Sequence, residues 1–255
     1  MKDRPLQTRI IYGPIDSRRL GKSLGVNILP TAEKICSFDC LYCQYGFTAE
    51  KQDRAGARRV ELPFPAEVAE ELAAALALSG PLDAITLAGN GEPTLHPAFR
   101  QIAEAVAHQR DLHRPGVPVC ILSNSSTLHD PNVQAAFQSI DRRVMKLDAG
   151  TEETFQKLNR PGPGLTLEKI AGGLAQLKPV EIQALFLDGP VSNTASKEIE
   201  AWLGHLEKIR PVAVQVYTFD RQPADQRLVQ VSGERLEQIA AAVRSRLPKA
   251  KVTVY

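Results

Sequence analysis

The sequence predicts a parallel α/β fold in a single domain of 255 residues. Six short apolar runs alternate with amphipathic stretches of helical period, as strands and helices alternate in successive βαβ units. Runs such as 117–122 are apolar almost throughout, which suits strands covered on both faces. The chain length is ordinary for one large α/β domain. An open doubly wound sheet and a barrel both satisfy this pattern.

The N-terminal part is the least regular. Residues 9–12 predict a short edge strand, and residues 25–29 predict the first core strand, which Pro30 ends. Between them, the glycine-rich segment 13–27 predicts an ordered loop whose backbone approaches another group closely. Its cations, Arg18, Arg19 and Lys22, are suited to a carboxylate or phosphate, or form a solvated basic turn. Residues 47–63 lack periodicity and predict a further loop.

From residue 65 the alternation is regular. Pro65 suits a first helical turn, and Gly80-Pro81 stops that helix. Helices are expected at 65–79, 97–108, 132–140, 152–158, 167–177, 196–209 and 234–247. Strands are expected at 84–88, 117–122, 143–147, 180–187 and 212–218, with a short closing strand at 251–255. Polar clusters follow each strand, at the end where parallel α/β folds place their active sites.

Three of the four cysteines, Cys36, Cys40 and Cys43, lie within eight residues after the first core strand. A structural zinc ion takes four ligands in a closed shell, and a ferredoxin-type cluster takes four cysteines. Three cysteines therefore need a distant fourth ligand, such as Cys120 or a histidine, or they leave an open coordination position. Three unligated cysteines are the remaining alternative, although free cysteines tend to be buried.

The composition is that of an ordinary globular protein, with 43% hydrophobic and 24% charged residues. The net charge of +2 does not by itself indicate a nucleic-acid partner. No apolar run approaches the roughly 20 residues of a membrane span, and the N-terminus lacks the apolar stretch of a signal peptide. We expect a cytoplasmic protein without a membrane partner, and grouped cysteines in such a chain favour metal or redox chemistry.

The C-x3-C-x2-C spacing, with aromatic Tyr42 before the last cysteine, resembles the cluster loop of the radical S-adenosylmethionine (SAM) superfamily. The resemblance covers about residues 25–220 and implies a partial (β/α)6 barrel, preceded by a basic extension at 1–24 and followed by a helix and strand at 233–255. The segments 13–27, 89–94 and 146–161 are similar to the wyosine-synthase-like branch of that superfamily.

This resemblance implies a site. Cys36, Cys40 and Cys43 would hold a [4Fe–4S] cluster, and the turn Gly89-Asn90-Gly91-Glu92 would receive the amino group of SAM. Further positions match SAM- or substrate-binding positions of the family: Asn124, Ser126, Asp148, Arg160 and Tyr217. Helix capping is the alternative role for the Asn and Asp side chains, a surface charge for Arg160 and a core aromatic for Tyr217. Asp188, Asp220 and Arg221 end strands where they would face a substrate, and Cys120 is expected in the core.

The implied reaction is reductive cleavage of SAM to methionine and a 5′-deoxyadenosyl radical, which abstracts hydrogen from the substrate. The barrel would orient the substrate and exclude water, so no residue is assigned an acid–base role. A flavodoxin or ferredoxin would supply the electron. A non-catalytic iron–sulfur carrier or sensor is the alternative from another class.

The substrate is the open part of this prediction. Modification of a tRNA base is the leading specific hypothesis, with peptide or small-metabolite modification as alternatives. A second cysteine-bound cluster, as in wyosine synthases, cannot be built with one remaining cysteine. The near-neutral net charge gives little support for an RNA substrate, whose backbone demands a basic surface. A local basic rim could still be formed by Arg18, Arg19, Lys22, Arg54, Arg58 and Arg59.

Overall fold

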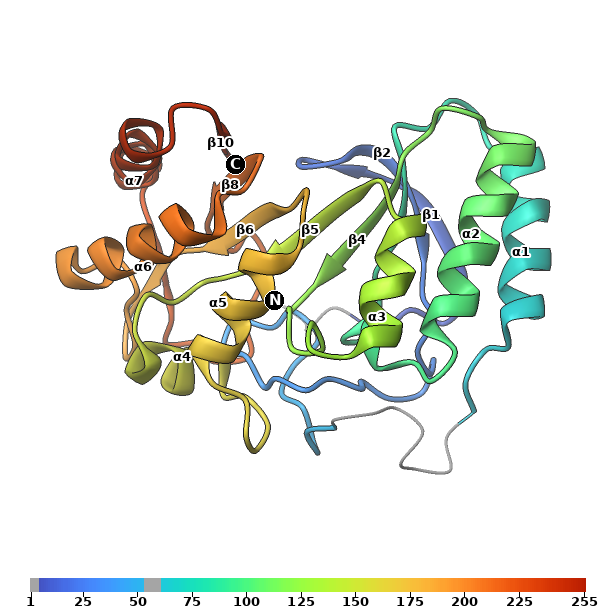
Figure 1. The fold of residues 1–255 in the computed structure, drawn as a ribbon. Coiled ribbons are helices and arrows are strands. Elements are labelled where there is room, and N and C mark those ends of the chain that lie inside the picture. The colour runs from blue at the N-terminus through green and yellow to red at the C-terminus, as the bar shows by residue number, and fades with distance from the viewer. Residues whose placement is uncertain (1–4, 53–60) are drawn as a thin grey trace.

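The structure is a computed structural model, and it describes residues 5–52 and 61–255. Within these residues, eight strands form one sheet in the order β1-β2-β3-β4-β5-β6-β8-β10 (Figure 1). All neighbouring strands are parallel except β1 and β2. The strands are β1 (Ile11–Ser17), β2 (Gly21–Val26), β3 (Ala84–Leu87), β4 (Val119–Ser123), β5 (Arg142–Lys146), β6 (Glu181–Leu185), β8 (Ala213–Tyr217) and β10 (Lys251–Val254).

The predicted α/β fold is confirmed, and the strand order decides between its two forms. Strands β2 to β8 lie side by side in chain order, without the reversal that defines a doubly wound sheet. Right-handed crossovers in one direction place the connecting helices on one face of the sheet. The sheet therefore forms a partial barrel of six parallel strands. One edge is extended by β1 and the other by β10.

The helices match their predicted positions closely, because their apolar faces and caps are local signals. They are α1 (Pro65–Leu78), α2 (Phe99–His113), α3 (Pro131–Ala136), α4 (Glu152–Asn159), α5 (Leu167–Gln176), α6 (Ser196–Ile209) and α7 (Gly233–Arg246). Helix α2 runs beyond its predicted end at His108 because the next helix-breaking residues are Pro115 and Gly116. Side chains of Thr151, Thr166 and Ser232 cap α4, α5 and α7 by accepting from the N3 amide.

The glycine-rich segment 13–27 was predicted as a loop, and this prediction is wrong. Residues 11–26 form the β1–β2 hairpin, with a register shift between Tyr12 and Ile15 that accommodates Gly13-Pro14. Glycine is required at position 25, because a Cβ there would lie 2.1 Å from the Tyr12 ring. The first core strand is consequently Gly21–Val26 rather than residues 25–29. Part of the predicted N-terminal extension is thus built into the sheet.

The hairpin tip crosses the opening of the partial barrel. Figure 1 shows the blue hairpin reaching from β2 toward the end of the sheet that carries β8 and β10. Arg18 at the tip forms an ion pair of 3.1 Å with Asp220, which follows β8. Leu20 is buried against Ala84 and Cys120 on the inner side of the sheet. The tip therefore links the two sides of the open barrel.

The predicted strand at 180–187 divides after Leu185. Strand β7 (Leu187–Asp188) leaves the main sheet and pairs with β9 (Val229–Gln230), which had not been predicted. Short η helices follow β3 (η2, Pro93–Leu95) and α3 (η3, Phe137–Ser139). In the described residues, no helix is both long and apolar enough to cross a membrane.

Candidate cluster and SAM pocket

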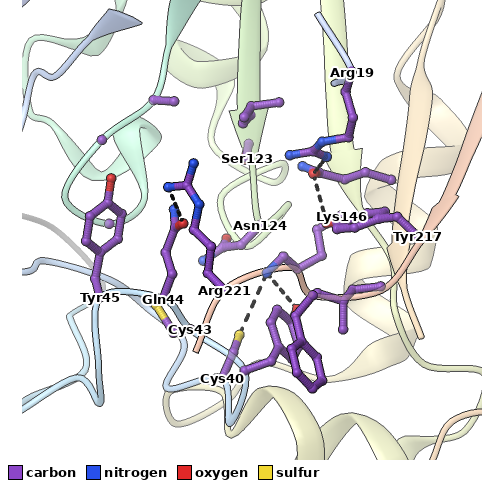
Figure 2. Close-up of a pocket in the computed structure, with 18 of the residues that line it drawn as sticks. Arg19, Cys40, Cys43, Gln44, Tyr45, Ser123, Asn124, Lys146, Tyr217 and Arg221 are labelled. Carbon is purple, nitrogen blue, oxygen red and sulfur yellow. Dashed lines mark hydrogen bonds between the residues drawn. The ribbon is translucent and has the colours of Figure 1, made fainter. Parts of the chain in front are cut away.

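A cavity of about 390 Å³ opens at the C-terminal ends of the parallel strands. The cysteine loop, the Gly89–Glu92 turn, the ends of β4, β5, β6 and β8, and the hairpin tip all line it (Figure 2). The sequence placed its candidate residues after these same strands. Some of these residues face the cavity and can contact a ligand. The others point away from it and stabilise the loops around it.

Cys36, Cys40 and Cys43 all line the cavity. Cys120 does not: it is fully buried with Leu20 and Ala84, as expected for a small core residue. None of the 5 histidines, all of which are described, lines the cavity. Neither fourth ligand suggested for a zinc site is therefore beside the three cysteines. In the described part of the chain, no three His, Cys, Asp or Glu side chains are grouped to hold a metal ion.

The end of helix α4 holds the cysteine loop in place. The amide of Leu41 donates to the carbonyl of Leu158 at 3.0 Å, and the amide of Asp39 donates to Asn159 at 3.0 Å. Asp39 is buried and accepts from the Thr48 amide at 2.6 Å. The guanidinium of Arg160 forms an ion pair with Asp39 at 3.1 Å and lies outside the cavity lining. In this structure Arg160 supports the loop.

Nitrogen donors surround two of the cysteine sulfurs. Asn124 Nδ2 lies 3.5 Å from Cys36 Sγ, and Asn159 Nδ2 lies 3.5 Å from Cys40 Sγ. Lys146 Nζ lies 3.8 Å from Cys40 Sγ (Figure 2). Burial raises the pKa of the Cys36 thiol to about 12 and also raises that of Cys40. A buried thiolate is stable only where nearby donors or cations compensate its charge. Asn124, Asn159 and Lys146 supply that compensation, so the site suits cysteines that lose their protons when they bind iron.

The Gly89–Glu92 turn packs too tightly for side chains at its glycines. A Cβ at Gly91, where φ is +136°, would lie 1.7 Å from the Ile35 carbonyl oxygen. The amide of Glu92 donates to this same oxygen at 2.9 Å, which ties the turn to the cysteine loop. Asn90 is fully buried and does not line the cavity; its side-chain Nδ2 donates to the carbonyls of Gln7 and Pro30.

Glu92 is a buried carboxylate with several partners. Its Oε1 accepts from the Thr94 amide and hydroxyl and from the Ser123 hydroxyl, at 3.1, 2.6 and 2.9 Å. Its Oε2 accepts from the Asn124 amide at 2.5 Å. Burial raises its pKa, although these donors oppose the shift. Since each carboxylate oxygen has two lone pairs, Oε2 can accept another donor from the cavity that Glu92 lines.

The segment after β4 joins the turn to the cysteine loop. Asn124 lines the cavity, and its Nδ2 also donates to the Ser37 hydroxyl at 2.9 Å. Ser126 is buried outside the lining; its hydroxyl bonds that of Ser37 at 2.7 Å, and its amide donates to Asn124 Oδ1. Asn124 thus faces the site, whereas Ser126 positions it.

Asp148 lies beneath the cavity surface, with its side chain fully buried. Its Oδ2 accepts from the Tyr42 hydroxyl and from Asn159 at 3.0 Å, and its Oδ1 accepts from the Leu185 amide at 2.9 Å. The hydrogen bonds of Asp148 therefore fix the position of the Tyr42 ring, which lies between the second and third cysteines of the loop. This arrangement does not place the Asp148 carboxylate at the cavity surface.

The opposite side of the cavity carries Tyr217, Gln183 and Lys146. The Tyr217 hydroxyl donates to Gln183 Oε1 at 3.3 Å, and both residues line the cavity. Lys146, Gln183 and Gln215 are direct neighbours on β5, β6 and β8, so their side chains form one row. Arg19 donates to Gln183 of this row, and Figure 2 shows Arg19 above Lys146.

Among the remaining strand-end residues, Asp220 and Arg221 line the cavity, and Arg221 donates to Gln44 at 3.0 Å. Asp188 instead accepts from Ser192 and Thr194, both at 2.6 Å, and so stabilises its own turn. Of the predicted basic rim, Arg54, Arg58 and Arg59 lie outside the described residues.

Sequence analysis missed the roles of Lys146, Gln183 and Asn159. A signal was available for two of them, since Lys146 follows the buried apolar pair Val144-Met145 and Gln183 lies between the buried residues Ile182 and Ala184. Burial opposes the charged form of Lys146, but Cys40, Asp148 and Tyr217 outweigh this effect and raise its pKa. Lys146 is therefore a cation beside the cysteine loop.

Comparison with protein families matches residues 34–189 to the radical SAM superfamily. Curated relatives include a UPF0026 protein of Synechocystis sp., 31% identical over 81% of this chain and 74% of that protein. A UPF0026 protein of Methanocaldococcus jannaschii is 34% identical over 65% of this chain and 48% of that protein. A protein of Brachyspira hyodysenteriae named GTPase Obg is 30% identical over 91% of this chain. The chain spans only 33% of that protein's length.

Solved structures show the same fold at low sequence identity. A radical SAM methyltransferase of Sphaerobacter thermophilus has a TM-score of 0.61 and 15% identity, over 91% of this chain and 65% of that one. Streptococcus suis SuiB bound to its precursor peptide SuiA has a TM-score of 0.64 and 14% identity, over 91% of this chain and 48% of that one. SuiB has also been solved with SAM bound.

Proposed function

Because the chain belongs to the radical SAM superfamily and is related to UPF0026 proteins, we propose that its cavity holds a [4Fe–4S] cluster and SAM. One observation carries this proposal: Cys36, Cys40, Cys43 and Glu92 line the same cavity, although the turn with Glu92 and the cysteine loop are far apart in sequence. An iron–sulfur carrier or sensor would need the cysteines alone. A carboxylate with spare acceptor capacity beside them suits an ammonium group.

The residues fit both groups. Three cysteines supply thiolates for three irons, and Asn124, Asn159 and Lys146 offset the added negative charge. Glu92 Oε2 would accept the amino group of SAM, and Gly89 and Gly91 let the turn pack closely against Asn27 and the Ile35 carbonyl, which holds Glu92 in place. When bound, cluster and SAM supply a 5′-deoxyadenosyl radical by reductive cleavage of SAM, with methionine as the other product.

The chain's own task is orientation. The hairpin tip closes the open side of the barrel through Arg18 and Asp220, and Tyr217 and Gln183 face the cavity from the side opposite the Gly89–Glu92 turn. A substrate held against these side chains would be shielded from water while hydrogen is removed. The electron would come from a flavodoxin or ferredoxin.

The direct test is anaerobic reconstitution with iron and sulfide, followed by dithionite and SAM. We expect four irons per chain and formation of 5′-deoxyadenosine, measured by chromatography and mass spectrometry. A protein that retains its cluster but forms no 5′-deoxyadenosine would support the carrier or sensor instead.

For the substrate, our specific proposal is a base in tRNA. It is supported by the similarity of segments 13–27, 89–94 and 146–161 to wyosine-synthase-like proteins and by the cations of the hairpin tip. Comparing modified nucleosides in tRNA from cells with and without the gene tests it. Identical nucleoside profiles, together with a change in peptides or metabolites, would favour the alternative substrate classes.

A further inference from the structure

Arg19, at the tip of the β1–β2 hairpin, is a cation that the proposed cluster and SAM chemistry does not use. Five cationic and three acidic side chains line the cavity. Lys146 faces Cys40, Arg18 pairs with Asp220, and Lys34 donates to the Gly46 carbonyl. Arg19, in contrast, reaches to the inner side of the barrel.

Within residues 5–52 and 61–255, the contacts of the Arg19 guanidinium are with uncharged groups. Its Nη1 donates to Gln183 Oε1 at 2.5 Å and to Gln215 Oε1 at 3.4 Å, and its Cζ lies 4.6 Å from the centre of the Tyr217 ring. Among the residues the structure describes, no carboxylate pairs with Arg19, and its Nε and Nη2 have no acceptor. A partly desolvated guanidinium with two free donors matches the paired oxygens of a carboxylate or phosphate.

The framework holds Arg19 in this position. Gln183 Nε2 donates to the Val144 carbonyl at 3.1 Å, which leaves its Oε1 facing Arg19. Leu20, the next residue, is buried against the inner face of the sheet and fixes the tip from below. A donor positioned before binding loses little conformational entropy when the ligand arrives. These contacts therefore suit recognition of a ligand better than a solvated surface charge.

The place of Arg19 relative to the cysteines also matters. In Figure 2, Lys146 lies between Arg19 and Cys40. Gln183, the neighbour of Lys146 on β6, also lines the cavity and accepts from Arg19. The turn expected to receive SAM lies on the other side, at β3 and β4. A group bound to Arg19 would therefore occupy the part of the cavity left to the substrate.

We propose that Arg19 binds an anionic group of the substrate, a carboxylate or a phosphate, on the β6–β8 side of the cavity. This inference rests on the proposed function, since it assigns the opposite side of the cavity to SAM. The anion would fix the distance between the reacting carbon of the substrate and the site where SAM is cleaved.

The test measures binding of two probes, inorganic phosphate and acetate, to reconstituted protein saturated with SAM, by isothermal titration calorimetry. We expect wild type to bind at least one probe, and its preference to distinguish a phosphate from a carboxylate. Arg19→Gln should weaken that binding by about tenfold or more, because it removes a charge-assisted pair. Arg244→Gln is the matched control, since it removes an equal charge from the outer surface of α7.

Failure of wild type to bind either probe, or equal affinity in Arg19→Gln, would overturn the proposal. So would a loss of SAM affinity in Arg19→Gln with unchanged probe binding, because Arg19 would then serve the cofactor. If Arg19→Gln unfolds, Arg19→Lys provides the comparison: it keeps the charge, loses the planar fork and should still weaken binding. Binding requires no turnover, so an Arg19-dependent anion site without 5′-deoxyadenosine would reject the proposed function and retain the anion site.

Discussion

The two sides of the cavity are built differently. On the β3–β4 side, formed by the Gly89–Glu92 turn and residues 123–126, each polar side chain has a hydrogen-bond partner within the protein. Glu92 alone accepts four hydrogen bonds from Thr94, Ser123 and Asn124. On the β6–β8 side, formed by Gln183, Tyr217 and the approaching Arg19, the Nε and Nη2 donors of Arg19 have no acceptor among the residues that the structure describes.

This difference separates framework from recognition. A satisfied network fixes one geometry and suits a group that every turnover needs in the same place, such as SAM. Spare donors suit a ligand that completes them on binding. Changes on the first side should therefore damage folding and cofactor binding together, whereas changes on the second should act mainly on the substrate.

The largest effect is expected at the cysteines. Cys40→Ala removes a buried cavity thiol and should abolish both the cluster and 5′-deoxyadenosine formation. Cys120→Ala removes a buried thiol from the barrel core and should leave both intact. Iron content and the visible absorption of reconstituted protein provide the measurement. Retention of a full cluster in Cys40→Ala would mean that its ligands are wrongly assigned.

The next effect concerns Glu92. Glu92→Gln places an amide where both oxygens accept from buried donors, so some donors lose their partner, and we expect about 2–4 kcal/mol lower stability. SAM affinity should fall in the same variant. Tyr217→Phe, which removes one long hydrogen bond on the opposite side, is the control and should cost under about 1 kcal/mol. Denaturant unfolding measures both, and equal losses would remove the distinction between the two sides.

Lys146 links the two sides electrostatically. Lys146→Met keeps the length of the side chain but removes a positive charge 3.8 Å from Cys40 Sγ. Loss of that charge should lower the reduction potential of the cluster by on the order of 100 mV. A redox titration followed by electron paramagnetic resonance measures the change. Lys157→Met, on the exposed face of α4, should leave the potential unchanged, and an unaltered potential in Lys146→Met would contradict the electrostatic role.

The smallest effect is a pH dependence behind the β3–β4 side. Burial lowers the pKa of His96 to about 4, below its ordinary value of 6.5. The unfolded chain therefore binds more protons between these values, and stability should fall as pH decreases through this window, levelling off below about pH 4. His96→Gln should reduce the loss between pH 7 and pH 5 by about 2 kcal/mol, measured by denaturant unfolding. Exposed His129→Gln should follow wild type, and a wild-type slope in His96→Gln would exclude this histidine.

Much of the fold was predictable because its signals are local. Strands β3 and β4 are largely apolar, β5, β6 and β8 carry buried apolar residues, and α4, α5 and α7 begin with capping side chains. The hairpin was not predictable in this way. Gly13–Asp16 are exposed on an edge strand, so β1 shows no alternating pattern, and Gly13-Pro14 suggests a loop. The hairpin forms because Leu20 and Arg18 contact residues of, or next to, distant strands.

The site was predictable to the extent that its residues follow motifs. The cysteines, Glu92 and Asn124 line the cavity, as does Tyr217. Ser126, Asp148 and Arg160 occupy the right strand ends or helix end but face inward or toward the cysteine loop. Sequence position fixes which strand end a residue follows, whereas its partners decide whether it faces the cavity. Asn159 shows this most clearly, because its bonds to Cys40 and Asp148 depend on where α4 ends.

The most direct test of the central claim is the electron paramagnetic resonance spectrum of the dithionite-reduced cluster, recorded with and without SAM. In the proposed site, three cysteines hold three irons of the cluster, which leaves a fourth iron beside Glu92 for SAM. We therefore predict that SAM changes the spectrum of wild type and has a much weaker effect in Glu92→Gln. A complete cluster whose spectrum is identical with and without saturating SAM would contradict the account.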